Sequence, residues 1–429
     1  GGGINTVLPL VPQIGMMYLF LSFLEDSGYM ARAAFVMDRL MQALGLPGKS
    51  FVPLIVGFGC NVPSVMGART LDAPRERLMT IMMAPFMSCG ARLAIFAVFA
   101  AAFFGQNGAL AVFSLYVLGI VMAVLTGLML KHTIMRGEAT PFVMELPVYH
   151  VPHVKSLVIQ TWQRLKGFVL RAGKVIIIVS IFLSAFNSFS LSGKIVDNIN
   201  DSALASVSRV ITPIFKPIGV HEDNWQATVG LFTGAMAKEV VVGTLNTLYT
   251  AENIQEEEFN PAEFNLGDEL AGALGETWQS LKDTFSLSVL ANPIEASKGD
   301  GEMATGAMGV MGAKFGSAAA AYSYLIFVLL YVPCISVMGA IARESSRGWM
   351  GFSILWGLNI AYSLSTLFYQ TVSYKEHPTY SLVCILTVIL FNIVLLGMLR
   401  RARSRVDIEL LATNKTPGSC CASTTGDCH

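Results

Sequence analysis

Three cysteines of this chain lie in glycine- or proline-containing stretches of otherwise apolar sequence. Cys60 stands in GFGCNVP, Cys89 in PFMSCGAR and Cys334 in YVPCISV. Around Cys60 the glycines let the backbone bend and the following proline breaks a helix, which exposes carbonyl oxygens beside the thiol. Cys89 and Cys334 each follow a proline at corresponding places of two sequence repeats. Sulfur ligands beside a broken backbone predict a site for a metal ion.

Glu239 is the acidic residue that most needs an explanation, because it lies in the middle of an apolar segment. A charged side chain costs roughly 2.5–3.5 kcal/mol at the centre of a membrane helix, so a cation or a basic partner must compensate it. We interpret Glu239 as an ion ligand. An ion pair with Lys238 or with Arg92 is the structural alternative, although adjacent helical residues do not face one another.

Weaker candidates lie at the edges of the apolar segments and in the polar tail. Asp26 closes the first apolar run, where pairing with Arg32 explains it at least as well as a role at an ion entrance. Met66 offers a thioether, but methionine is common in apolar cores. The tail cysteines could form a metal-binding cluster or belong to a dispensable end. These tail residues are Cys420, Cys421 and Cys428.

The type of ligand restricts the type of ion. Mg²⁺ and Ca²⁺ prefer oxygen ligands only, whereas thiolates with a carboxylate suit Fe²⁺, Mn²⁺, Co²⁺ or Zn²⁺. Cys384 serves as a contrast, because no glycine, proline or charge lies near it and we interpret it as a packing residue.

The sequence Gly48-Lys49-Ser50 lacks the first glycine of a phosphate-binding loop, so we predict no nucleotide site and no catalytic residue in this chain.

The composition places these candidates in a membrane. Of the residues, 53% are hydrophobic and only 14% charged, and the mean hydropathy is +0.58, which is too apolar for a soluble domain. Lys plus Arg and Asp plus Glu balance at 29 each, which does not suggest nucleic acid as a partner. We predict an all-α polytopic membrane protein with spans at 5–24, 77–104, 109–130, 174–190, 317–342, 348–370 and 378–400.

Basic residues beside these spans fix the predicted orientation. If all the basic groups face the cytoplasm, Gly1 lies outside and His429 inside, so the C-terminus is cytoplasmic. The acidic stretch from Glu252 to Glu302 then forms an external loop. Two apolar segments, 51–70 and 226–249, must begin and end on the same side, so we expect them to be broken or re-entrant and to line a pathway.

The two halves of the chain follow the same order. Each has a span, a polar or amphipathic stretch, a broken segment and a span that contains a cysteine. The charge assignment opens the first broken segment to the cytoplasm and the second to the outside. This inverted-topology pattern is typical of secondary transporters, whose substrate site lies at the interface of the repeats.

Four stretches resemble the membrane domain of the ferrous iron transport protein B family, and the tail CCASTTGDCH resembles its enterobacterial branch. The four stretches are LEDSGYMARAAFVMDRLM, GKSFVPLIVGFGCNVPSVMGART, PFMSCGARLAIFA and YVPCISVMGA. The resemblance implies two Gate repeats and uptake of Fe²⁺, as the transported substrate, across the bacterial inner membrane. It also implies an ion path at Cys60, Cys89, Cys334 and Glu239.

Partners follow from the same resemblance. It implies a GTP-binding domain elsewhere in the same polypeptide, small accessory iron-transport proteins and a possible homo-oligomer, all surrounded by membrane lipid. We therefore divide the chain into a first Gate repeat, a cytoplasmic connector, a second Gate repeat with an acidic loop at about 250–316, a final span and a tail. Their expected bounds are 1–130, 131–173, 174–370, 371–400 and 401–429.

Two other functions remain open from the sequence. Gate-like repeats resemble those of nucleoside carriers, so the chain could transport a nucleoside or another organic solute. Such a site would need hydrogen-bonding and aromatic groups, which are few in the broken segments. A membrane metal or redox sensor would instead use the tail cysteines, and deletion of the tail would then abolish function.

Overall fold

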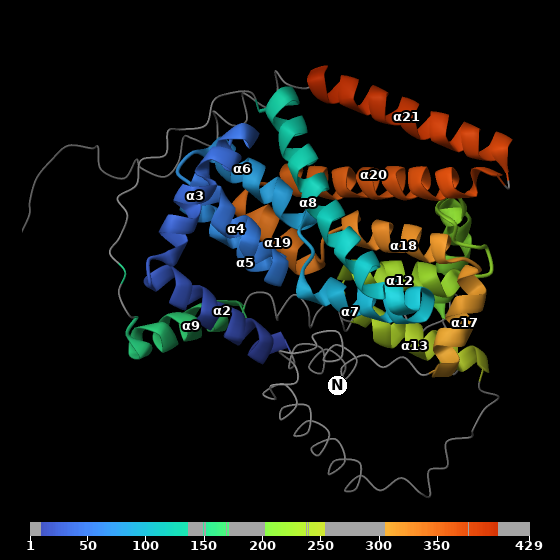
Figure 1. Cartoon of the computed structure of the whole chain (residues 1–429), viewed down its shortest axis with the longest axis horizontal. Helices are drawn as coiled ribbons and strands as arrows, with labels where there is room; N and C mark the ends of the chain where they lie inside the picture. The colour runs from blue at the N-terminus through green and yellow to red at the C-terminus, as the bar shows by residue number, and fades with distance from the viewer. Residues whose placement is uncertain are drawn as a thin grey trace, which may run out of the picture.

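The computed structural model describes residues 10–135, 152–168, 202–236, 240–253, 305–375 and 377–401, together with the single positions 149, 170 and 238. Every regular element in these ranges is a helix, and apolar stretches long enough for a membrane recur along them (Figure 1). The predicted all-α membrane fold is therefore confirmed. The predicted span at 174–190, most of the acidic loop, Glu239 and the tail from 402 onward lie outside the described residues.

Four apolar stretches of the described residues are long enough to cross a membrane, or five if one sharply bent helix pair counts as a span. The pair consists of Tyr29–Leu44 and Gly48–Gly59, which meet at 101°. The four stretches are Pro74–Thr133, Ala318–Glu344, Arg347–Lys375 and Pro378–Arg401. Three of them have 24 to 29 residues, enough for one crossing of a hydrocarbon core of roughly 30 Å, whereas Pro74–Thr133 has 60. The predicted first span appears as α2 (Leu10–Asp26).

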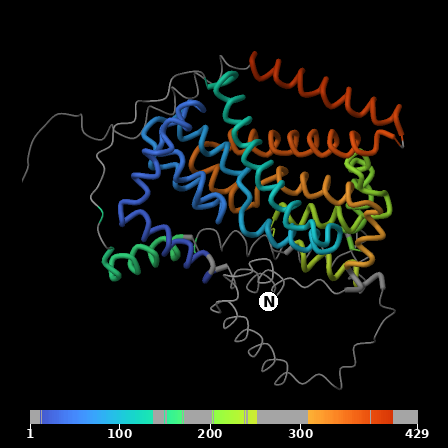
Figure 2. The backbone as a smooth tube through the Cα atoms, viewed as in Figure 1, coloured from blue at the N-terminus to red at the C-terminus, as the bar shows by residue number. Residues whose placement is uncertain are grey.

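The last helices form the clearest bundle. Figure 2 shows α18 (Ala318–Leu330), α20 (Arg347–Val372) and α21 (Pro378–Arg401) running side by side, with α20 in the middle. Side chains of α21 such as Val383, Leu390 and Ile393 are exposed. Large, mostly exposed apolar side chains are typical of a helix on the lipid-facing surface.

Small residues let α8 (Gly108–Thr133) approach the centre of the first half. Gly119, Ala123 and Gly127 repeat at every fourth position and are buried. A Cβ atom added at Gly119 would lie 2.9 Å from the carbonyl oxygen of Phe86, and one at Gly127 would lie 2.7 Å from the sulfur of Met83. Small residues at this spacing are typical of close helix packing in membranes.

The first broken segment is confirmed. It forms α4 (Phe51–Gly59) and α5 (Asn61–Gly67), which pack against each other and are separated only by Cys60. In a continuous helix the ring of Pro63 would clash with the carbonyl of Gly59, and its missing N–H would leave that carbonyl without a donor. The chain therefore turns at Cys60.

The second broken segment is confirmed as well. It forms α12 (Trp225–Met236) and α13 (Val240–Asn253), which pack against each other across a break that contains Lys238. In Figure 1 the α4–α5 pair and the α12–α13 pair lie toward opposite ends of the molecule. This arrangement agrees with two broken segments that open to opposite sides, and the inverted repeat stays a prediction.

Two spans predicted to be continuous are in fact interrupted, which corrects the sequence analysis. The span predicted at 77–104 consists of α6 (Pro74–Met83), the short helix η3 (Ala84–Phe86), a non-helical stretch through Cys89, and α7 (Gly90–Phe99). The span predicted at 317–342 is α18 and α19 (Ile335–Glu344), separated by residues 331–334. Pro85 and Pro333 lie at these interruptions, and proline disfavours helix both at its own position and at the residue before it.

The remaining described elements surround these broken helices. The N-terminal half adds α3 (Tyr29–Leu44), the short helices η1 (Gly48–Ser50) and η2 (Ala68–Thr70), and a π-helical turn at Ala100–Phe104 that leads into η5 (Gly105–Asn107) and α8. The connector contributes α9 (Val154–Phe168), which packs against α2. The second half adds α11 (Ala203–Ile211), η8 (Thr212–Ile218), α17 (Thr305–Phe315) and η9 (Ser373–Lys375).

Cations stabilise one end of the molecule by binding helix carbonyls. Lys131 donates to the carbonyl of Ala43 at 2.9 Å, near the end of α3. Arg75 donates to the carbonyls of Met135 and Gly45 at 3.0 and 3.4 Å. Basic side chains near a helix C-terminus satisfy carbonyls that the helix itself leaves free.

An ion pair joins the two repeats at this same end. α5 packs against α19, and Arg69, just after α5, binds the Glu344 carboxylate at the end of α19 through Nε–Oε2 at 2.6 Å and Nη2–Oε1 at 2.5 Å. Arg77 donates to the Glu344 carbonyl oxygen at 2.7 Å. The hydrogen bond to Glu344 raises the pKa of Arg69, since it favours the charged guanidinium.

We predict that Glu344→Gln weakens the junction of the repeats. The variant leaves Arg69 without the carboxylate, while the bond of Arg77 to the Glu344 carbonyl is retained. The expected loss is roughly 1–2 kcal/mol, because half of the Arg69 side chain is exposed and solvent screens the pair. Thermal unfolding of the detergent-solubilised protein measures it. Asp72→Asn, which removes the exposed partner of Lys49, is the matched control and should leave the melting temperature unchanged. Equal melting temperatures for the two variants would contradict the prediction.

Candidate functional site

Cys60 occupies the turn of the first broken segment. It has an extended backbone, with φ −152° and ψ 131°, and it directly precedes α5. Its N–H donates to the carbonyl of Val56 at 3.1 Å, which ends α4. The side chain is half-buried. The thiol is thus placed at a helix interruption, as the sequence predicted.

Cys89 occupies a second interruption, directly before α7. Its backbone is extended, with φ −77° and ψ 162°, and its side chain is half-buried. The guanidinium of Arg92, which is completely buried, donates from Nη1 to the carbonyl of Met87 at 2.9 Å and from both Nη atoms to the carbonyl of Pro85 at 3.1 Å. These bonds satisfy carbonyls that the interrupted helix leaves free.

Cys334 occupies the third interruption, directly before α19. Its backbone is extended, with φ −60° and ψ 156°, and its carbonyl accepts from the N–H of Val337 at 2.9 Å. At the other side of this interruption, the hydroxyl of Tyr331 donates to the carbonyl of Leu231 on α12 at 3.3 Å. The three cysteines therefore share one local geometry, an extended residue at the start of a half-helix.

Lys238 marks the fourth interruption and lies beside the third. Its Nζ is 4.9 Å from the centre of the Tyr331 ring, which is close enough for a cation–π interaction. Gly234 lies against the same tyrosine, since a Cβ added there would approach the Tyr331 hydroxyl to 2.5 Å. The break of α12–α13 and the break before Cys334 thus meet at one aromatic ring.

The first two interruptions are joined by a hydrogen bond. Asn61, the residue after Cys60, donates from Nδ2 to the carbonyl of Met87 at 3.3 Å. A Cβ added at Gly57 would lie 3.0 Å from the Cβ of Met87, so α4 is also in close contact with this stretch. Because α5 packs against α19, and α18 packs against η3 and α7, all four interruptions belong to one connected region.

The sulfur atoms are not yet a closed metal site in this structure. Among the described residues, no three His, Cys, Asp or Glu side chains are close enough together to hold a metal ion. The fold brings together the backbone breaks that carry Cys60, Cys89 and Cys334. Glu239, which the sequence analysis adds to these ligands, lies outside the described residues, as do Cys420, Cys421 and Cys428.

The weaker candidates lie away from these interruptions. Asp26 ends α2, and within the described residues Arg32 does not pair with it. Arg32 instead donates to the carbonyl of Gly28 at 3.3 Å and stacks over the ring of Tyr149 at 3.5 Å. Cys384 is half-buried within the uninterrupted helix α21, where no break presents it.

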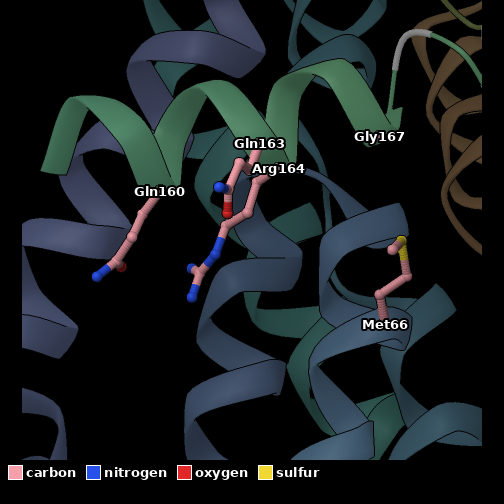
Figure 3. A pocket seen from close by; sticks show the side chains of 5 residues that line it. All are labelled: Met66, Gln160, Gln163, Arg164 and Gly167. Carbon is pink, nitrogen blue, oxygen red and sulfur yellow. The ribbon is translucent and has the colours of Figure 1, made fainter. Parts of the chain in front are cut away.

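Met66 lines a cavity of about 390 Å³ between α5 and α9. Figure 3 shows the Met66 thioether opposite the side chains of Gln160, Gln163 and Arg164, with Gly167 at the end of α9. These four α9 positions follow an i, i+3, i+4, i+7 pattern, so one face of the helix covers the cavity. Arg164 also pairs with Glu25 at 2.7 Å, which holds α9 against α2. The connector is thus attached beside the half-helix that begins at Cys60.

Comparison with known proteins gives this arrangement a family. The model of the Gate family, described as nucleoside recognition, matches residues 7–103 and 169–347. A second model, described as the C terminus of ferrous iron transport protein B, matches residues 112–164. No solved structure matches the chain.

Curated relatives are very similar over the whole chain. The identity is 94% to the Fe(2+) transporter FeoB of Escherichia coli K12 and 93% to that of Shigella flexneri. It is 92% to the Fe(2+) transporter FeoB of Salmonella typhimurium LT2. In each case the match covers 100% of this chain and 56% of the relative, so the chain spans about half the length of these proteins. The chain belongs to the ferrous iron transport protein B family, of which it is the membrane part that carries the Gate repeats.

Proposed function

We propose that this chain is the membrane permease for ferrous iron uptake across the bacterial inner membrane. The observation that supports the proposal is the placement of Cys60, Cys89 and Cys334, each at the extended residue of a helix interruption. Non-helical backbone at membrane depth is tolerated only where protein buries it or where it lines a polar cavity. Three thiols at three such points make soft ligands available along one path.

The local electrostatics favour ligands that carry negative charge. Cys89 and Cys334 directly precede α7 and α19, and the partial positive charge at a helix N-terminus stabilises an anionic side chain. A metal ion is bound by thiolate and not by thiol. Fe²⁺ accepts sulfur together with carboxylate or carbonyl oxygen, so Glu239 completes the proposed ligand set. Asp26 and Met66 are proposed only as weaker contributors toward the cytoplasmic side.

Nucleoside transport is the less favoured alternative, although the Gate model carries that description. Asn61 and Tyr331 are two of the hydrogen-bonding groups at the interruptions that could bind a nucleobase. Both already make hydrogen bonds to main-chain carbonyls, at 3.3 Å to Met87 and 3.3 Å to Leu231. A nucleoside would have to compete for these two donors, whereas a thiophilic cation would not.

The proposal includes partners that the resemblance implies. The relatives are longer than this chain, and we propose that their remaining part supplies the GTP-binding domain that drives or regulates transport. Small accessory iron-transport proteins and a homo-oligomer belong to the same proposal. This chain itself carries the ion path and holds no nucleotide.

A role of the tail cysteines as a metal or redox sensor is tested by deleting residues 402–429, which should leave transport intact.

We predict that Cys60→Ser and Cys334→Ser each lower Fe²⁺ uptake by at least about tenfold, because a hydroxyl replaces a soft ligand at nearly constant volume. The measurement is uptake of radioactive iron into cells that produce the full-length protein, with the amount of inserted protein determined in parallel. Cys384→Ser is the matched control and should retain most uptake, since this half-buried thiol lies in a continuous helix.

Equal losses in all three variants would show that the cysteines act through packing and would remove them from the path. Competition experiments distinguish the substrates. Excess Co²⁺ or Zn²⁺ should inhibit uptake, and excess Mg²⁺ or a nucleoside should not.

We propose that the C-terminus and the basic end of the molecule face the cytoplasm. In Figure 1 the start of α20 and the end of α21 lie toward the same end as α3, and they carry Arg347 and Arg400. Cytoplasmic ends of membrane helices are enriched in lysine and arginine. The acidic loop then faces the outside.

We predict that a membrane-impermeant thiol reagent labels a cysteine introduced at Glu256 in whole cells but does not label the native Cys428. Both become accessible when the cells are permeabilised, which is the internal control. Labelling of Cys428 in intact cells, with position 256 protected, would reverse the proposed orientation and the direction of both broken segments.

A further inference from the structure

Arg92 is a buried cation close to Cys89, one of the proposed metal ligands. Its side chain has no exposed surface, and it lies one turn after Cys89 in α7. None of the ion pairs among the described residues includes it, and its Nε has no hydrogen-bond partner there. A guanidinium buried in a membrane protein without an acidic partner is costly, so its position calls for a specific role.

Within the described part of the chain, the hydrogen bonds of the guanidinium all go to one helix interruption. Nη1 bridges the carbonyls of Met87 and Pro85 at 2.9 and 3.1 Å, and Nη2 makes a second bond to Pro85 at 3.1 Å. The planar fork of arginine donates in several fixed directions, whereas lysine presents one point charge on a flexible stem. Arg92 therefore fixes the backbone on which the Cys89 thiol is presented.

The Met87 carbonyl extends this control to a second cysteine. It accepts from Arg92 Nη1 at 2.9 Å and from Asn61 Nδ2 at 3.3 Å. Asn61 is the first residue of α5 and directly follows Cys60. One carbonyl oxygen thus connects the two interruptions, and each of its two bonds comes from a residue close to a different thiol.

We propose that Arg92 is a positioning residue that holds the Cys60 and Cys89 thiols in register for one metal ion. This inference rests on the proposed function, because it assumes that both thiols bind the ion. Its charge is also available to balance the negative charge that thiolate ligands bring into a buried site. Residues that orient metal ligands typically change metal affinity by about 10–100-fold when they are removed.

The experiment measures protection of individual thiols by Cd²⁺, a thiophilic divalent ion that does not change oxidation state. Membranes that contain the full-length protein are titrated with Cd²⁺, alkylated and analysed peptide by peptide by mass spectrometry. In the unmodified protein, Cd²⁺ should protect the Cys60 and Cys89 thiols from alkylation, and half-protection of both should occur at the same Cd²⁺ concentration, the midpoint. In Arg92→Lys both midpoints should rise by at least about tenfold and should no longer coincide.

A second variant tests the shared carbonyl with a smaller perturbation. Asn61→Leu removes the other donor to Met87 at similar volume, so it should also separate the two midpoints. The double variant Arg92→Lys with Asn61→Leu should shift them by less than the two separate shifts combined, because both substitutions act on the same carbonyl.

Arg75→Lys is the matched control. Arg75 also donates to two main-chain carbonyls, those of Met135 and Gly45, but at the end of the molecule away from the cysteines. In Arg75→Lys, the Cd²⁺ midpoints of Cys60 and Cys89 should stay within about twofold of those in the unmodified protein. Melting temperatures in detergent report how far each variant perturbs the fold.

Midpoints in Arg92→Lys that match the unmodified protein would overturn the positioning role. Equal shifts in Arg92→Lys and Arg75→Lys would also overturn it, since both would then reflect general destabilisation. If Cd²⁺ protects none of the cysteines in the unmodified protein, the proposed metal path itself fails, and this outcome is separate from the other two.

Discussion

The structure depends on one constraint, which is that every backbone N–H and C=O group inside a membrane must find a partner within the protein. A continuous helix meets it automatically, but an interrupted helix exposes several such groups. Here the interruption before Cys89 is compensated by specific contacts: Arg92 donates to the Pro85 and Met87 carbonyls, and Asn61 donates to the Met87 carbonyl. The interruptions can therefore persist at depth, and three of the four place a cysteine where a continuous helix would have offered only side-chain packing.

The same constraint explains which parts of the fold could be predicted. Glycine and proline around Cys60 predicted the first broken segment correctly, because Pro63 cannot donate and its ring excludes the Gly59 carbonyl. The interruptions at Cys89 and Cys334 were missed, since apolar length dominated the interpretation of 77–104 and 317–342. Pro85 and Pro333 carried the necessary signal. The packing of the connector helix α9 beside Met66 depends on tertiary contacts that no local pattern encodes.

The thiols of the candidate site were predicted from the sequence, but the residues that contact the backbone around them were not. Cys60, Cys89 and Cys334 stood out by residue type and surroundings, whereas Arg92 was considered only as a possible partner of Glu239. Its hydrogen bonds depend on which carbonyls the interruption leaves free, and these follow from the three-dimensional path of the chain. A repeated pentapeptide, SVMGA at 64–68 and 336–340, is a signal for the paired half-helices α5 and α19. Their ends are joined by the contact of Arg69 with Glu344.

The central claim is that the metal ion is bound by sulfur at the helix interruptions. X-ray absorption spectroscopy of the full-length protein loaded anaerobically with Fe²⁺, with the tail cysteines replaced by serine, tests it most directly. The account predicts sulfur atoms bonded to the iron, and their number should fall when Cys60 or Cys334 is also replaced by serine. A spectrum that contains only oxygen or nitrogen ligands, unchanged by these replacements, would contradict it.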